Sequence, residues 1–175
     1  MVWEVLEGAI ILIRKETKKG VINLNTNASK PQTVEKLRLA GLNSMRVSLN
    51  SVRGKFYNAY YKPNGYAFKD VILSIQAMKK LGGFVSINYL VMPGFTDQKE
   101  EAAALFDFIS TTKIDMIQWR NLNYDPVDYF RKMKLYDVGA RHAVPLRTIG
   151  ISQLIENVKK NFPKLRHGYF NPRII

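Results

Sequence analysis

The sequence predicts an α/β protein with about four successive βα units and a helical C-terminal tail. Short β-prone runs alternate with amphipathic segments of helical periodicity, and glycines close several of these segments. With 175 residues, of which 46% are hydrophobic, the chain is long enough to bury a core. Strands that alternate with helices pair in parallel, so every strand-to-helix loop lies at one edge of the sheet. That edge is where α/β proteins bind their ligands.

The first expected element is a helix over residues 3–18. Trp3, Leu6, Ile10 and Ile13 follow the spacing of a buried helix face, and charged residues occupy the other face. Two lysines and a glycine at residues 18–20 then supply the positive charge and the stop that are typical of a helix C-terminus.

Strands and helices alternate through the middle of the chain. The expected strands cover residues 21–26, 44–49, 84–92 and 114–119. The expected helices cover residues 34–41, 68–81 and 97–110, and residues 50–67 are expected to form a long polar and aromatic loop. Asp97, with Glu100 three positions later, resembles a capping box that starts the third of these helices.

The C-terminal tail is less regular than the βα units. It is expected to contain a short helix at 127–133, a loop at 136–145, an amphipathic helix at 151–162 and an extended or weakly ordered end at 167–175. No low-complexity stretch or domain linker interrupts the chain, so we expect a single domain over residues 1–175.

The residue types present exclude several kinds of chemistry. The chain has no cysteine, which excludes disulfides, thiolate nucleophiles and thiolate-bound metals or clusters within it. The two histidines, His142 and His167, are too few for a dedicated site, so we expect no metal site.

The charge and hydropathy patterns bear on partners and location. A net charge of +13 attracts nucleic acid, nucleotides or acidic partners, although the cations are scattered as they are on an ordinary solvated surface. No apolar run is long enough to span a bilayer and no secretory signal is visible, so we expect a cytoplasmic protein without a membrane partner.

Three strand-end stretches carry a family resemblance. They are LNTNA at 24–28, RVSLNS at 46–51 and SINYLVMPGFTD at 86–97, and they occur in this order with helices between them. The set resembles the third, fourth and fifth strands of a radical S-adenosylmethionine (SAM) enzyme barrel. The resemblance covers residues 3–125, and residues 126–175 would be a C-terminal extension.

The resemblance implies a fold and a function. The fold would be a partial parallel (βα) barrel of about four strands, equivalent to the third to sixth strands of the family. The chain would bind SAM at the C-terminal edge of the sheet. It would generate a 5′-deoxyadenosyl radical only when a further N-terminal segment supplies the cysteines of a [4Fe–4S] cluster, so the chain alone would be inactive. The resemblance identifies no catalytic base, radical-relay residue or substrate.

Polar residues at the strand ends are the candidate cofactor-binding residues. By resemblance, these residues contact SAM, and short polar side chains suit ribose hydroxyls while an arginine suits a carboxylate. The same residues could instead cap turns, satisfy buried neighbours or carry surface charge. The candidates are Thr26, Asn27, Ser48, Asn50, Ser86, Asn88, Met92, Arg120 and Asn121.

Two other functions remain open from the sequence. Residues 55–63 mix aromatic and basic side chains, a combination that single-stranded nucleic acid binding uses, so the chain could be a basic α/β module for RNA or nucleotide. Alternatively, a cut barrel leaves strand edges unpaired, and the chain could be a non-catalytic scaffold that pairs with itself or with a partner chain.

Overall fold

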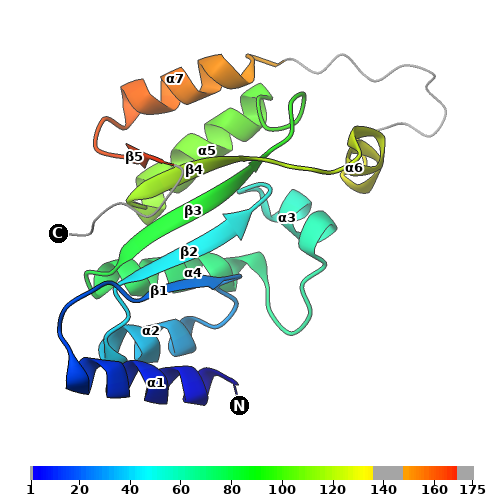
Figure 1. Ribbon diagram of the computed structural model, residues 1–175. Helices are drawn as coiled ribbons and strands as arrows, with labels where there is room; N and C mark the ends of the chain where they lie inside the picture. The colour runs from blue at the N-terminus through cyan, green and yellow to red at the C-terminus, as the bar shows by residue number, and fades with distance from the viewer. Residues whose placement is uncertain (1, 136–147, 169–175) are drawn as a thin grey trace.

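The computed structural model describes residues 2–135 and 148–168 and contains one parallel sheet (Figure 1). Its strands are β1 (Asn23–Thr26), β2 (Ser44–Leu49), β3 (Phe84–Val91), β4 (Met116–Asn121) and β5 (Arg166–His167). They lie side by side in the order of the sequence, and every neighbouring pair is parallel. The expected α/β fold with a partial, barrel-like parallel sheet is therefore confirmed. The sheet is not closed, because within the described residues β1 and β5 are its two edges.

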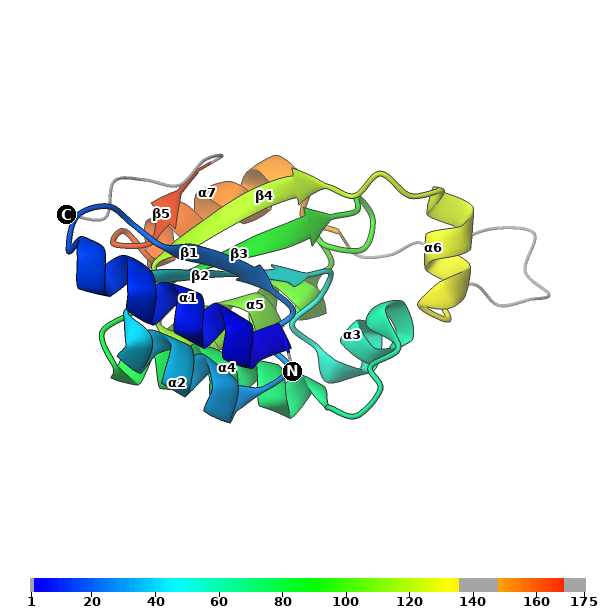
Figure 2. The same ribbon diagram turned by 60° about the horizontal axis from the view of Figure 1, so that its bottom comes forward.

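Seven helices are described, and most lie where the periodicity predicts them. They are α1 (Val2–Glu16), α2 (Pro31–Ala40), α3 (Gly54–Tyr61), α4 (Phe68–Lys80), α5 (Lys99–Thr112), α6 (Pro126–Lys132) and α7 (Ile151–Asn161). In Figures 1 and 2, α1, α2, α4, α5 and α7 wrap around the outside of the curved sheet, while α3 and α6 lie beyond the C-terminal ends of its strands.

The helix α3 was not predicted, because residues 50–67 were expected to be a loop. Phe56 and Tyr57 are its buried residues, and Lys62 ends it in the left-handed conformation with φ 46°. Aromatic residues have only modest helix propensity, so tertiary packing stabilises this short helix.

The main core lies between the sheet and its outer helices. Met45, Val47 and Leu49 of β2 are fully buried, as are their neighbours Ile87 on β3 and Ile117 on β4. Successive residues of a strand point to opposite faces, so the intervening residues point to the inner, concave face of the sheet. The alternation of the sequence thus separates an apolar outer face from a polar concave face.

A second apolar cluster lies at the C-terminal ends of the strands. Phe56 of α3, Met92 and Phe95 of the β3–α5 connection, and Tyr129 and Met133 at α6 form it. The Phe95 ring meets Phe56 edge-on with centroids 5.0 Å apart, and it meets Tyr129 at 5.3 Å. We call these five residues the carboxyl-edge cap, because they pack α3 and α6 against the C-terminal ends of the strands.

One expectation about the end of an element is wrong, and one short strand was not predicted. Asp97 does not form the capping box, because Gln98 precedes the first turn of α5 and the Asp97 carboxylate accepts from the backbone N–H of Gly94 at 2.7 Å.

The short β5 was missed because Arg166 and His167 show no strand pattern of their own and become a strand only by pairing with β4. The expected loop at 136–145, and residues 169–175 of the extended segment expected at 167–175, lie outside the described residues. Among the described helices, none is both long and apolar enough to cross a bilayer.

Candidate ligand-binding site

The parallel register arranges the concave face as rows of side chains that run across the strands. One row contains Asn25, Arg46, Ser86 and Met116, and the next row toward the C-terminal edge contains Ser48, Asn88 and Gln118. A last row places Leu90 beside Arg120. Polar side chains dominate these rows, whereas the residues between them on the same strands form the apolar core. Several polar side chains that converge on one concave surface can fix the orientation of a ligand, so this face is a candidate ligand-binding site.

The row of Ser48, Asn88 and Gln118 forms hydrogen bonds but leaves one buried acceptor, the Asn88 Oδ1, without a donor among the described residues. The Asn88 amide donates to the Ser48 hydroxyl at 3.5 Å. The Asn88 Oδ1 is buried and accepts no hydrogen bond from any described residue. Gln118 is fully buried, and its side-chain oxygen accepts from the Arg120 guanidinium at 3.3 Å. A buried carbonyl oxygen without a donor is costly, so the Asn88 Oδ1 is available to accept a hydrogen bond from a ligand.

Two guanidinium groups give the concave face a positive potential. Arg46 and Arg120 lie on β2 and β4, with β3 between them, and both occupy concave positions. Burial, and then the charge of Arg120, lower the pKa of Arg46. Two cations close enough to affect one another favour an anionic group between them, and a guanidinium binds a carboxylate in a two-pronged geometry.

The structure brings only some of the predicted residues to this face. Ser48, Ser86, Asn88 and Arg120 share it, but Thr26 does not. Thr26 is paired with the core residue Val47, and its hydroxyl accepts from the Ala28 N–H at 3.0 Å. Thr26 therefore faces the outer, helix-covered side of the sheet. The expectation that it lies beside the other candidate SAM-binding residues is corrected.

Asn27 and Asn121 are also placed away from the concave rows. The Asn27 side chain is exposed and accepts from the Ser29 N–H at 3.2 Å, which is the turn-capping role of an asparagine. Asn121 is exposed at the end of β4 and is paired with Val91.

Met92 belongs to the carboxyl-edge cap, and Asn50 is hydrogen-bonded to two of its residues. The Asn50 amide is fully buried and donates to the Phe56 carbonyl at 3.2 Å and to the Tyr129 hydroxyl at 3.3 Å. Met92 packs within the apolar cluster of the cap. Both residues position the two helices that border the concave face, and neither belongs to the polar rows.

Sequence reasoning missed Arg46, Gln118 and Asn25 as candidate residues. The period of two along a strand could have found Arg46, because it lies two residues before Ser48 and must share its face. The position of Gln118 opposite Asn88 depends on the register between β3 and β4, which only the folded sheet fixes.

The aromatic segment at 55–63 packs into the protein and does not form an open loop. Tyr57 is fully buried, its ring lies 4.7 Å from those of Tyr61 and Phe68, and the Tyr61 hydroxyl is buried as well. Tyr60 packs against Tyr129 with centroids 6.0 Å apart. Rings that are engaged in this way are not free to stack on the bases of a single-stranded nucleic acid.

The fold defines the class of protein: an open, barrel-like parallel α/β protein whose concave face carries rows of polar side chains. A comparison with protein families matches residues 3–106 to the radical SAM superfamily, which is more than half of the chain. The chain therefore belongs to the radical SAM superfamily. A search of curated proteins found no match.

Solved structures share this fold at low sequence identity. The chain is similar to methylornithine synthase (PylB), with a TM-score of 0.61 and 15% identity over 93% of this chain and 44% of that one. It is similar to a domain of pyruvate-formate lyase-activating enzyme from Bacteroides vulgatus, with a TM-score of 0.63 and 9% identity over 97% of this chain and 91% of that one. It is also similar to HydG, a maturase of the [FeFe]-hydrogenase, with a TM-score of 0.53 and 15% identity over 75% and 34% of the two chains. The chain thus spans less than half the length of methylornithine synthase, and these likenesses show the fold alone.

The residues of this chain fit one of the family's two cofactors. The family implies SAM and a [4Fe–4S] cluster. The cluster requires thiolate ligands, and this chain has no cysteine, so its own residues do not fit the cluster. Within residues 2–135 and 148–168, no three acidic or histidine side chains gather to hold another metal ion. The concave face does fit SAM, because it offers an acceptor without a donor, a hydroxyl and two guanidinium groups.

Proposed function

We propose that this chain is the part of a radical SAM enzyme that binds SAM on the concave face of its sheet. The observation that carries the proposal is the buried Asn88 Oδ1, which has no donor among the described residues and lies in a polar row beside two arginines. Bound SAM would supply a 5′-deoxyadenosyl radical for hydrogen abstraction, because one electron from a cluster would cleave its bond between sulfur and the 5′ carbon and release methionine.

The concave residues have distinct roles in this proposal. Ser48 and Asn88 provide a hydroxyl and an amide of the size that ribose hydroxyls require. Arg120, with Arg46, attracts the carboxylate of the methionine part. Ser86 is 2% exposed and lies between Arg46 and Met116 in the neighbouring row, so it forms part of the floor beneath these side chains. The carboxyl-edge cap limits the access of water at the strand ends.

A cysteine-containing segment completes the enzyme along β1. No described strand occupies the outer edge of β1. Beside it, α1 exposes Val2, Val5 and Leu12 by 80%, 72% and 65%, although these side chains are apolar. A hollow of 470 Å³ between Trp3, Leu6 and β1 lies along the same edge. An added parallel βα unit would pair with β1, fill the hollow and bury this helix face, and it could belong to the same polypeptide or to a partner chain.

Calorimetric titration of the 175-residue chain with S-adenosylhomocysteine tests the binding part of the proposal. We expect saturable binding, because this analogue of SAM retains the ribose and the carboxylate. Ser48→Ala should weaken it by about tenfold, which corresponds to the loss of one good hydrogen bond. The matched control is Ser152→Ala, which removes an exposed hydroxyl from α7 and should leave the affinity unchanged. No heat from folded protein would contradict the proposal.

An anaerobic assay with iron, sulfide, dithionite and SAM tests whether the chain needs a separate segment to bind the cluster. The chain alone should release no 5′-deoxyadenosine, because it has no thiolate to hold a cluster. Release of 5′-deoxyadenosine by the chain alone would overturn the idea that a separate segment supplies the cluster site.

A further inference from the structure

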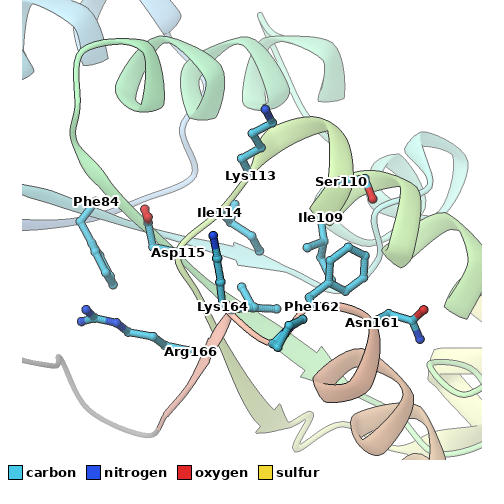
Figure 3. A pocket seen from close by; sticks show the side chains of 12 residues that line it. Phe84, Ile109, Ser110, Lys113, Ile114, Asp115, Asn161, Phe162, Lys164 and Arg166 are labelled. Atoms are coloured by element: carbon cyan, nitrogen blue, oxygen red, sulfur yellow. The ribbon is translucent and has the colours of Figure 1, made fainter.

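A second candidate site lies at the N-terminal ends of the strands, opposite the carboxyl edge. A groove of 710 Å³ opens where β3, β4 and β5 begin, between the end of α5 and the connection from α7 to β5 (Figure 3). This is the amino edge of the strands, so the groove is separate from the carboxyl-edge cap and from the SAM-binding end of the rows. Its volume lies within the range of about 300–1,000 Å³ that small-molecule sites occupy.

The groove combines an apolar floor with a basic rim. Phe84, Ile109, Ile114 and Phe162 form the floor. Lys113, Lys164 and Arg166 surround it and are all solvent-exposed, and Figure 3 shows Lys164 extending across the middle of the groove. Lys113 comes from the α5–β4 connection, Lys164 from the α7–β5 connection and Arg166 from β5, and only the folded sheet brings the three cations together.

The one carboxylate in the groove does not neutralise this rim. Asp115 accepts from the Lys79 ammonium at 2.6 and 2.7 Å and from the Val85 N–H at 2.7 Å, so α4 and β3 already engage it. Within the described residues, neither Lys113 nor Lys164 nor Arg166 forms an ion pair. The Arg166 guanidinium lies 5.7 Å from the centroid of the Phe84 ring, which holds the cation over the apolar floor.

We propose that this groove binds a small amphipathic anion, with an aliphatic or aromatic body on the floor and a carboxylate or phosphate group at the rim. The apolar floor favours a hydrophobic body, and the charge of the rim requires an anionic head. A cationic amphiphile of the same shape is excluded by the three like charges. The occupant would also join β5 and its preceding connection to β4 and α5, so binding stabilises the terminal strand of the sheet.

Nuclear magnetic resonance of the ¹⁵N-labelled 175-residue chain tests the proposal with octanoate, octyl phosphate and octylammonium as probes. We expect octanoate or octyl phosphate to shift the amide signals of Lys113, Ile114, Lys164 and Leu165 in a saturable manner. The comparison of these two anions identifies the preferred head group. Octylammonium has the same body and the opposite charge, so it should leave these signals unchanged. At 100 times its dissociation constant, the bound anion should raise the melting temperature by about 5–10 °C.

A charge-reversed double variant, Lys164→Glu with Arg166→Glu, is the specific control. Both side chains are exposed, so the variant should fold, and its affinity for the anion should fall at least about tenfold. The variant Lys18→Glu with Lys19→Glu makes the same change of net charge at the end of α1 and should bind as the parent does. Equal binding of octylammonium, undiminished binding by the first variant, or shifts confined to the exposed apolar residues of α1 would each overturn the proposal.

Discussion

The side-chain amide of Asn88 donates to the hydroxyl of Ser48 at 3.5 Å across the β2–β3 pair, while the carbonyl oxygen of the same Asn88 is buried without a described partner. An isolated domain gains nothing from such an arrangement, because the carbonyl oxygen loses its water and receives no donor in return. A ligand that donates to this oxygen removes the cost. The relationship between these two residues therefore connects the register of the sheet to the proposed SAM site.

Asn88→Leu should separate stability from binding. Leucine has a similar size and removes the unsatisfied acceptor, so the free energy of unfolding should stay within about 1 kcal/mol of the parent value or rise. The affinity for S-adenosylhomocysteine should fall at least about tenfold. Urea denaturation and calorimetry measure the two effects. A variant that loses stability and keeps its affinity would show that Asn88 is a structural residue.

Thr26→Ala should have the opposite pattern. Its hydroxyl accepts from the Ala28 N–H on the outer side of the sheet, so its loss should cost about 1 kcal/mol of unfolding free energy. Because Thr26 does not face the polar rows, the affinity for S-adenosylhomocysteine should not change. A tenfold loss of affinity in a folded Thr26→Ala protein would place Thr26 in the binding site after all.

Glu101 should make stability depend on pH in a specific direction. This fully buried carboxyl accepts from the Ser51 hydroxyl at 2.6 Å and from the Tyr89 hydroxyl at 2.8 Å. Burial raises its pKa above the ordinary value of 4.5, although these hydrogen bonds and Arg53 act in the other direction. The folded state thus binds this proton more tightly than the unfolded state does. The resulting stabilisation is fully present below the ordinary pKa and is lost as the pH rises through the raised one.

Glu101→Gln removes this titration and keeps a side-chain oxygen that can accept hydrogen bonds from the Ser51 and Tyr89 hydroxyls. The free energy of unfolding of the parent, minus that of the variant, should therefore decrease as the pH rises from about 4 through the raised pKa. Urea denaturation of both proteins at a series of pH values gives this difference. A difference that is flat or increases with pH would contradict the raised pKa.

The two partners of the Lys79–Asp115 ion pair should contribute unequally. Lys79 and Asp115 are partly exposed, so Lys79→Met should cost less than about 1 kcal/mol. Asp115→Ala also removes the acceptor of the Val85 N–H and should cost about 1–3 kcal/mol. Thermal or urea unfolding of the two single variants makes the comparison. Equal losses would mean that the ion pair, and not the backbone hydrogen bond, dominates.

The exposed apolar face of α1 should not contribute to the stability of the chain by itself. Val5→Lys with Leu12→Lys changes two side chains that are 72% and 65% exposed, so unfolding should change by no more than about 0.5 kcal/mol. Any self-association of the parent chain at high concentration should decrease in the variant, as light scattering after size-exclusion chromatography would show. A large loss of stability would mean that this face is already covered.

The sequence alone was sufficient for the fold class and for most of the elements. Period-two alternation in β2 and β3 and helical spacing in α4 and α7 are local signals, because they record which side of each element is buried. The same alternation predicts that Ser86 and Asn88 share a face, and the structure places them so. The absence of cysteine likewise follows from the sequence without any coordinates.

Only the tertiary structure decided which strand-end residues meet. Thr26 ends β1 and Asn88 lies within β3. Both are polar, but the pairing of Thr26 with Val47 turns it to the outer face, and the pairing of Asn88 with Ser48 and Gln118 turns it inward. The helix α3, the strand β5 and the amino-edge groove depend equally on neighbours that are far away in the chain. The physical reason is that a side chain's environment in a sheet is set by register, and register is a relation between strands that no single strand encodes.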